Sequence, residues 1–588
     1  MIKQLLKSVR EYKRPTILTL VFMVLEAAIE TFIPFITAEK LINYLQTAEK
    51  EHLTIEMSYV WKIGLLLALM AFGSLACGGL AGLTSARASS GFAKNVRNDL
   101  FHKIQTFTFH NIDKFSAASL VTRTTTDVQN VQMAFMMVIR MAVRSPLMLI
   151  FSVIMAWSMG GWLAGTFAVV IPLLVFGLLM IAKKAMPAFR RVFKKYDVLN
   201  ESIEENVRAM RAVKGFSREE YEKEKFGKAS ENICKDFTKA ERIVALNTPL
   251  MNFCMYFNMV FILLIGSYLA ITSNGTSVNI GTISALLTYG VQILMSLMML
   301  SMMYVMLTIS AESARRICEV LNEEPDMTNC ENPLTEIEDG SIDFENVSFK
   351  YDIHAKKYTL SGINVHIRSG MTVGIIGGTG SSKSSLVQLI PRLYDTTEGV
   401  VRLSGHDVKE YDLVSLRDSV AMVLQKNLLF SGTVRENLQW GNENATDEEI
   451  SKACQLACAD EFVLAHPEGY DRMIEQGGTN VSGGQKQRLC IARALLKKPK
   501  VLILDDSTSA VDMKTDAKIR AALKTYIPET TKIIIAQRIA SIQDADLILV
   551  MDNGTIVAQG QHADLMQSCS IYREVYEQQT YGGENDAE

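Results

Sequence analysis

The chain has 588 residues, a formal net charge of −3 and 48% hydrophobic residues, and its mean hydropathy is +0.14. This apolar excess excludes intrinsic disorder, a collagen-like fibre and a small disulfide scaffold. The near-neutral charge gives no electrostatic footprint for a nucleic acid, so we expect no nucleic-acid partner. The apolar composition instead indicates a protein that contacts the lipid bilayer.

Six apolar segments before residue 310 are long enough to cross a bilayer, which takes about 20 residues each. They are residues 15–38, 60–84, 135–158, 161–182, 246–272 and 279–309. Residues 1–14 alternate basic with apolar side chains, which predicts an amphipathic helix on the inner leaflet. Lys and Arg are concentrated in the two long connections between spans, so we expect both termini in the cytoplasm. We therefore predict a multi-pass protein of the cell membrane, with an all-α six-helix domain over residues 15–318.

Two carboxylates interrupt the first apolar segment. Glu26 and Glu30 are four positions apart and share one helix face, and a charge at mid-membrane costs about 2.5–3.5 kcal/mol. They pair with Arg140 or Arg144 of the third segment or with polar backbone, they form a site for cationic amphiphiles, or they lie nearer the membrane interface than mid-membrane. Methionines at helical spacing within residues 295–306 allow a similar choice between helix packing and a deformable wall of a substrate cavity.

The composition changes near residue 320. Residues 319–341 are acidic and read as a linker, and β-branched strands then alternate with helical segments. The predicted strands are Thr372–Ile376, Val501–Leu504, Lys532–Ala536 and Leu547–Met551. This alternation predicts an α/β domain with a largely parallel sheet over residues 342–580. We expect residues 581–588 to be a disordered tail.

A glycine-rich loop follows the first of these strands and opens a helix, which is the context of a P-loop. Backbone N–H groups at such a helix start face phosphates, a lysine reaches the β- and γ-phosphates, and the next hydroxyl binds Mg²⁺. Residues predicted to hold the phosphates of ATP are Gly377, Gly380, Ser381, Ser382, Lys383, Ser384 and Ser385. Ser382 stands where such loops usually have Gly, so its Cβ is expected to crowd or strain the loop.

Two further motifs complete a nucleotide site. The apolar strand Val501–Leu504 ends in Asp505 and Asp506, and a carboxylate delivered in this way is the Mg²⁺-side acid of a P-loop ATPase. Between the motifs, a Val-Ser-Gly-Gly-Gln string places Ser482, Gly484 and Gln485 at a helix start. Such a start exposes several N–H groups to an anion.

These motifs together resemble an ATP-binding cassette (ABC) exporter half-transporter over nearly the whole chain. The resemblance implies that Tyr351 stacks on adenine and that Gln425 touches Mg²⁺ together with Ser384 and Asp505. Residues 113–127 and 210–219 resemble the two coupling-helix regions of the membrane domain. Family members dimerise head to tail, so the helix start at Ser482 would face ATP held by a second half-transporter.

Two departures from the family pattern concern hydrolysis. The family's catalytic Glu after the Mg²⁺-side Asp is Asp506 here, and its switch His is Gln537. A carboxylate withdrawn by about 1 Å from the attacking water can cost about 100-fold in rate, and Gln cannot carry the charge of a His. The pattern resembles the degenerate half of a heterodimeric exporter, the alternative being neutral drift in an active homodimer.

The predicted function is that of a subunit of an ATP-driven exporter, with ATP and Mg²⁺ as cofactors. Its own site would bind ATP and hydrolyse it weakly, while Ser482, Gly484 and Gln485 serve the partner's site. The expected substrates are amphipathic drug-like or lipid-like molecules. The alternatives are a regulatory membrane subunit gated by ATP without transport and an exporter of peptides.

Overall fold

The computed structural model describes residues 1–51, 54–273, 278–352 and 354–581. It forms two compact units, each described here by itself. The helical unit comprises Met1–Thr106 and Ser116–Glu323, and the α/β unit comprises Phe107–Phe115 and Glu324–Glu588. Of the predicted tail at 581–588, only Tyr581 is among the described residues, and it ends a helix. The rest of that prediction lies outside them.

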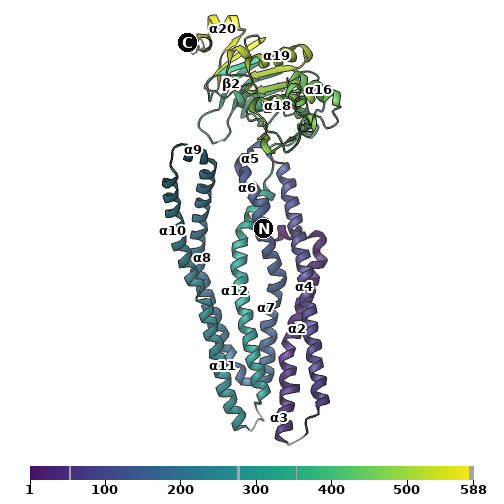
Figure 1. The fold of residues 1–588 in the computed structure, drawn as a ribbon, viewed down its shortest axis with the longest axis vertical. Helices are drawn as coiled ribbons and strands as arrows, with labels where there is room; N and C mark the ends of the chain where they lie inside the picture. Colours follow the sequence, from purple (N-terminus) through teal and green to yellow (C-terminus); the bar gives the residue numbers. More distant parts are fainter. Residues whose placement is uncertain (52–53, 274–277, 353, 582–588) are drawn as a thin grey trace. The chain divides into compact units, whose positions relative to one another are not determined.

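The helical unit is built from long helices that lie alongside one another (Figure 1). The helices are α1 (Ile2–Lys7), α2 (Lys13–Ile36), α3 (Asn43–Lys50), α4 (Met57–Gln105), α6 (Ala117–Thr122), α7 (Val128–Gly160), α8 (Thr166–Arg208), α9 (Met210–Gly215), α10 (Glu219–Val244), α11 (Asn247–Thr272) and α12 (Ile280–Asn322). Helix α7 packs along α12, α2 along α4, and α8 along α10. A buried apolar core joins α7, α8, α11 and α12.

Five helical stretches of the described residues are long and apolar enough to cross a membrane: Arg10–Lys50, Met57–Gln105, Ala117–Phe189, Glu219–Thr272 and Ile280–Asn322. The third stretch contains α7 and the first part of α8, joined by a 3₁₀ turn at Gly161–Gly165. Each of the six predicted apolar segments therefore lies on a helix of its own. Large apolar side chains on α4 point outward, with Trp61 74%, Phe72 68% and Leu75 71% exposed, as contact with lipid requires.

The N-terminal amphipathic segment does not form one helix over residues 1–14. Helix α1 ends at Lys7, a 3₁₀ turn follows at Arg10–Tyr12, and α2 begins at Lys13. The hydroxyl of Ser8 donates to Asp99 of α4 at 2.8 Å, and the Arg10 guanidinium lies 2.7 Å from the same carboxylate. These contacts tie the segment to α4, and the break between its two pieces coincides with the positive φ of 40° at Arg10.

The two carboxylates of α2 are paired with one arginine. Nη2 of Arg144 on α7 lies 2.7 Å from Oε2 of Glu30, and its Nε lies 3.5 Å from Oε1 of Glu26. The hydroxyl of Ser74 on α4 also donates to Glu30 at 3.5 Å. Of the readings that the sequence left open, these contacts favour charge pairing, and they select Arg144 as the partner.

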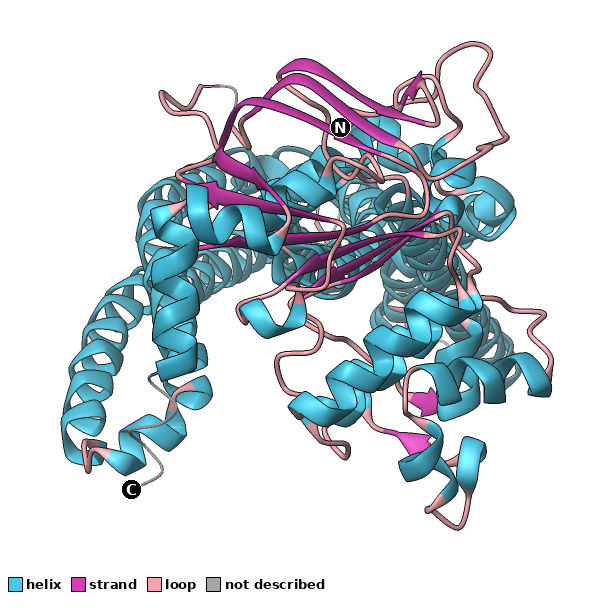
Figure 2. Cartoon of the chain, turned by 90° about the horizontal axis from the view of Figure 1, so that it is seen from above, coloured by secondary structure: helices cyan, strands magenta, loops and turns pink. Residues whose placement is uncertain are grey.

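The strands, magenta in Figure 2, all belong to the α/β unit. They are β1 (Ile342–Phe349), β2 (Leu360–Ile367), β3 (Thr372–Gly377), β4 (Glu398–Leu403), β5 (His406–Asp407), β6 (Val420–Val423), β7 (Gly432–Thr433), β8 (Met473–Ile474), β9 (Val501–Asp505), β10 (Thr531–Ile535), β11 (Leu547–Asp552) and β12 (Thr555–Gly560). The six-stranded sheet has the order β12-β11-β3-β10-β9-β6, and only β12 pairs antiparallel. The sheet β2-β1-β4-β5 is wholly antiparallel.

The helices of this unit complete the fold. They are α5 (Phe109–Phe115), α13 (Lys383–Gln388), α14 (Leu413–Ser419), α15 (Val434–Gln439), α16 (Asp447–Leu456), α17 (Asp460–Leu464), α18 (Gly483–Leu496), α19 (Met513–Tyr526), α20 (His562–Ser568) and α21 (Ser570–Tyr581). The predicted architecture, a helical domain followed by an α/β domain, is confirmed. The sequence did not indicate the antiparallel sheet, which carries Tyr351 just after β1.

Parallel pairing explains how distant motifs meet. Strands β3, β10 and β9 are neighbours, and β9 is buried at every position. Because parallel strands end at the same edge of a sheet, ligand sites form there. The residues after β3, β9 and β10 are the glycine-rich loop, Asp506 and Gln537.

Candidate nucleotide site

The glycine-rich loop wraps the ammonium group of Lys383. Its Nζ donates to the carbonyl oxygens of Gly377 and Gly378 at 2.8 and 2.9 Å and to the hydroxyl of Ser381 at 3.2 Å. A Cβ at Gly378 or Gly380 would meet nothing within 4 Å. The loop backbone is therefore open to a group that approaches closely, as a phosphate does. Burial lowers the pKa of Lys383, while the carboxylates of Asp505 and Asp506 oppose this shift.

Ser382 adopts the left-handed conformation, with φ +70° and ψ +26°. An L-residue with a Cβ is strained in this conformation by about 1–2 kcal/mol. The strain expected from a Ser at a position where such loops usually have Gly is therefore present in the backbone. Ser382→Gly should stabilise the chain by about 1 kcal/mol and tighten ATP binding, as measured by thermal unfolding and nucleotide titration. Ser381→Gly is the matched control, because Ser381 has no positive φ. An equal gain from both changes would contradict the strain argument.

Asp505 ends β9 as a buried carboxylate beside Ser384 and Lys383. Burial raises its pKa, whereas the hydrogen bond from Ser384 and the charge of Lys383 lower it. A carboxylate and a hydroxyl are oxygen ligands of the kind Mg²⁺ takes. Among the described residues, no group of three or more His, Cys, Asp or Glu side chains could hold a metal. Ser384 and Asp505 would therefore suit a Mg²⁺ ion that arrives with the nucleotide, and the ion would neutralise charge on the phosphates.

Asp506 is held by two side-chain amides. Nε2 of Gln537 donates to its Oδ2 at 2.7 Å, and Nε2 of Gln425 lies 3.5 Å from the same oxygen. The backbone of Asp506 has a positive φ of 47°, a conformation that Asp tolerates better than most residues. One oxygen of the Asp506 carboxylate, Oδ2, thus already accepts a hydrogen bond from a neighbouring amide.

Most of the predicted site residues line one pocket of about 450 Å³. Those present are Gly377, Gly380, Ser382, Lys383, Ser384, Ser385, Gln425, Asp505, Asp506 and Gln537. Ser381 is a buried residue of the loop itself, and its hydroxyl accepts a hydrogen bond from Lys383. The sequence did not predict that Ile571, Tyr572 and Val575 of α21 also line this pocket. No motif marks them, since only the fold brings the C-terminal helix to this edge.

Tyr351 lies beside the pocket rather than among its lining residues. Its hydroxyl is 2.9 Å from that of Ser385 and donates to Gln388 at 3.2 Å, so it is fixed against α13. The ring is 42% exposed, which leaves a face for a base to stack on. Its edge meets Tyr394 at 5.0 Å between ring centroids.

Tyr394 connects Tyr351 to α5. Its hydroxyl donates to the Asp113 carboxylate at 2.9 Å, and its ring lies 6.0 Å from that of Phe109. Burial, and then the hydrogen bond to Asp113, raise the pKa of Tyr394. The segment Phe107–Phe115, between two parts of the helical unit in sequence, therefore packs with the α/β unit.

The residues of the Val-Ser-Gly-Gly-Gln string lie outside this pocket. Ser482 caps α18: its hydroxyl accepts from the Gln485 N–H at 3.3 Å, and the Gln485 side chain accepts from the Ser482 N–H at 3.0 Å. A Cβ at Gly484 would lie 2.8 Å from the carbonyl oxygen of Ala510, so this position requires Gly. The structure thus separates these three residues from the chain's own phosphate loop.

The fold and the pocket define a membrane protein with a P-loop nucleotide-binding domain. Residues 16–310 match the ABC transporter transmembrane region, and residues 360–509 match the ABC transporter domain. The ABC transporter ATP-binding protein YfiB of Bacillus subtilis is 35% identical over 96% of both chains. A relative from Mycobacterium tuberculosis is 32% identical, again over 96% of both chains.

The chain therefore belongs to the ABC transporter family, as a half-transporter of the exporter type. Its fold matches the solved structure of a bacterial Atm1-family ABC exporter with ATP bound, with a TM-score of 0.82. That match covers 96% of this chain and 98% of the other at 22% identity. Transporters of this family act as dimers in a membrane and couple ATP hydrolysis to transport.

Proposed function

We propose that this chain is the weakly hydrolysing subunit of a heterodimeric exporter. Its pocket binds ATP with Mg²⁺ through Lys383, Ser384, Asp505 and Gln425. Ser482, Gly484 and Gln485 complete the active site of a second, different half-transporter. The chain lies in the cell membrane with both termini in the cytoplasm, since basic residues concentrate in the connections on that side.

The hydrogen bond from Gln537 to Asp506 carries this proposal. A general base must lie within hydrogen-bond reach of the attacking water, and the 2.7 Å hydrogen bond from Gln537 to Oδ2 fixes the orientation of the Asp506 carboxylate. Asp506 is also one methylene shorter than the Glu of the family pattern. An amide at Gln537 cannot take up a proton or carry the charge of a His. The side chains that bind ATP are present, while those that drive hydrolysis are altered.

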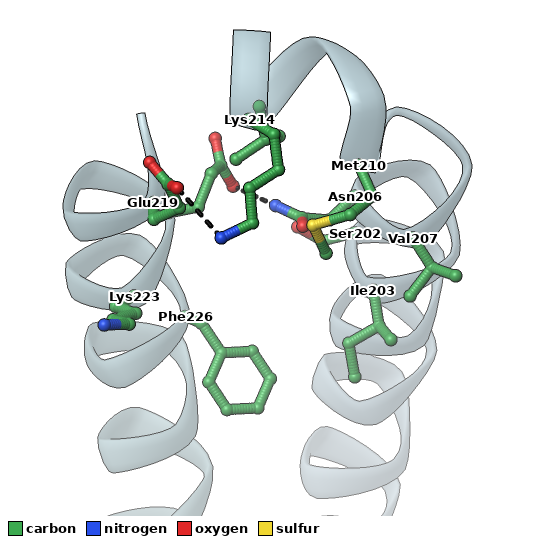
Figure 3. A pocket seen from close by; sticks show the side chains of 11 residues that line it. Ser202, Ile203, Asn206, Val207, Met210, Lys214, Glu219, Lys223 and Phe226 are labelled. Atoms are coloured by element: carbon green, nitrogen blue, oxygen red, sulfur yellow. Dashed lines mark hydrogen bonds and ion pairs between the residues drawn. The ribbon is translucent and has the colours of Figure 1, made fainter. Parts of the chain in front are cut away.

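Two segments support coupling of this site to transport. Helix α5 hydrogen-bonds through Asp113 to Tyr394, next to Tyr351. In the helical unit, α9 lies at the turn between α8 and α10, beside a pocket of about 550 Å³ (Figure 3). Phe216, which follows α9, is 80% exposed. We assign the tip formed by α9 and Phe216 to contact with the partner's nucleotide-binding domain.

Lys214 and Glu219 hold the tip in shape through an ion pair at 2.9 Å, and Asn206 donates to Glu222 at 2.7 Å (Figure 3). These bonds join the start of α10 to α9 and to the end of α8. A turn joined to both flanking helices in this way suits a segment that transmits motion between a nucleotide domain and membrane helices.

The proposed substrates are amphipathic small molecules. Several methionines of α12 have exposed side chains, with Met295 49% and Met302 55% exposed. Flexible, polarisable side chains can repack around differently shaped apolar ligands. The pairing of Glu26 and Glu30 with Arg144 leaves those carboxylates less suited to a cationic substrate.

The chain purified without its partner should bind ATP but turn it over at least about 100-fold more slowly than an active exporter. Asp506→Glu alone should restore little, because Gln537 still donates to the carboxylate. Asp506→Glu combined with Gln537→His should restore more than either single change. Phosphate release in nanodiscs and equilibrium ATP binding measure the two properties separately.

Normal turnover by the unaltered chain alone would contradict the degenerate site and favour an active homodimer. ATP-dependent change of shape without substrate-stimulated turnover in the assembled pair would favour a gate over an exporter. Tyr351→Ala serves as a binding control, since it removes a stacking face and should lower ATP affinity by about 1–3 kcal/mol.

A further inference from the structure

We propose that Gln579, near the end of α21, is a positioning residue of the nucleotide site. Its Oε1 accepts from the backbone N–H of Ile539 at 2.8 Å, and its Nε2 donates to the carbonyl oxygen of Gln537 at 2.8 Å. One side-chain amide thus bridges both ends of the segment 537–539, which connects β10 to the next 3₁₀ turn. This inference rests on ATP binding in the proposed function and not on weak hydrolysis.

The two hydrogen bonds of Gln579 to the segment 537–539 are called the clamp. The clamp is connected to the Asp506 carboxylate at the centre of the site. Gln579 fixes the backbone of Gln537, and the Gln537 side chain donates to Asp506 at 2.7 Å. Two hydrogen bonds, linked through the covalent structure of Gln537, therefore connect α21 to the carboxylate in the pocket. Movement of the last turn of α21 would change the position of the amide that holds Asp506.

Helix α21 is well anchored for this role. Tyr572 is 1% exposed, and its hydroxyl is 2.8 Å from Nδ1 of His562 on α20. Ile571 and Val575 line the same pocket as Lys383. The first two turns of α21 are thus part of the pocket wall, and Gln579 extends from this fixed base to the segment after β10.

The clamp should favour ATP over ADP. Asp506 and Gln537 share the pocket with Lys383, and a P-loop lysine reaches the β- and γ-phosphates. A misplaced Gln537 amide would therefore disturb the terminal phosphate most. Because ADP lacks the γ-phosphate, its binding should be affected less than that of ATP.

The test compares Gln579→Leu with Gln578→Leu in the full chain. Gln578 is exposed and lies in the same helix turn, so it controls for general effects on α21. We expect Gln579→Leu to weaken Mg·ATP binding about three- to tenfold, as the loss of one or two hydrogen bonds predicts. Mg·ADP binding should change less than about twofold, and Gln578→Leu should change neither affinity. Displacement of a fluorescent ATP analogue measures both.

Hydrogen exchange tests the clamp without nucleotide. Gln579→Leu should accelerate exchange in peptides that contain the Ile539 amide. Gln579→Glu keeps the acceptor for Ile539 but loses the donor to Gln537, so it should preserve that protection while still weakening Mg·ATP binding. Gln579→Leu added to Gln537→Ala should cause little further loss of ATP affinity, because the first residue acts through the second.

Unchanged exchange in Gln579→Leu, or equal losses of ATP and ADP affinity, would overturn the positioning role. Failure of the unaltered chain to bind ATP would contradict the proposed function instead. In that case the exchange experiment still decides whether Gln579 holds the segment 537–539.

Discussion

Ser482→Arg in the assembled heterodimer should reduce ATP hydrolysis about 100-fold, by analogy with loss of an oxyanion-hole donor. Ser482 caps α18, and its hydroxyl and the first N–H groups of the helix form the face proposed to meet the γ-phosphate of the partner's ATP. Arg removes the cap and adds bulk where the phosphate docks. Steady-state phosphate release by the purified pair measures the effect.

Lys383→Ala is the informative comparison, because it disturbs only the pocket of this chain and should leave a measurable fraction of the hydrolysis. Ser482→Thr retains a capping hydroxyl and should stay close to the unaltered pair. The partner's own P-loop Lys→Ala should match Ser482→Arg. The assignment of two unequal sites fails if Lys383→Ala is as damaging as Ser482→Arg while the partner's site remains occupied by ATP.

The sequence predicts many of the residues that line this pocket, because the motifs that carry them are local. A buried strand, a glycine-rich loop and a helix start are consecutive in the chain, so Lys383 and Ser384 could be placed before any fold was known. Asp505 follows for the same reason, since it ends a continuous apolar strand. The backbone strain expected as one possibility at Ser382 also depends on one residue only, and the structure gives this residue a φ of +70°.

Features that depend on tertiary packing could not be predicted from local motifs in the sequence. The sequence offered Arg140 and Arg144 equally to the carboxylates of α2, and only the rotation of α7 selects Arg144. Gln579 is one of two adjacent glutamines in a polar helix, with nothing in its pattern to mark it. The packing of α5 with the α/β unit likewise joins Asp113 to Tyr394 across 281 positions.

Replacing Arg144 by Met should destabilise the membrane domain by about 3 kcal/mol or more, since it leaves two carboxylates without their cation. Glu26 and Glu30 are only 13% and 27% exposed, and Arg144 is their ion-pair partner in the described structure. A Cβ at Gly78 would lie 3.2 Å from Oε1 of Glu26, so this carboxylate has little room to move away. Yield from membranes and thermal unfolding in detergent measure the loss.

Neutralising the carboxylates separates a structural from a substrate-binding role. If the ion pairs serve stability, Glu26→Gln with Glu30→Gln should restore much of the yield lost in Arg144→Met, because no unpaired charge then remains. Mg·ATP binding should be unchanged in every variant that folds, since the pocket lies in the α/β unit. If these carboxylates bind substrate, the double Gln variant should instead keep its stability and lose transport of cationic amphiphiles before that of neutral ones. The contacts with Arg144 lead us to expect rescue of stability and equal effects on both substrate types.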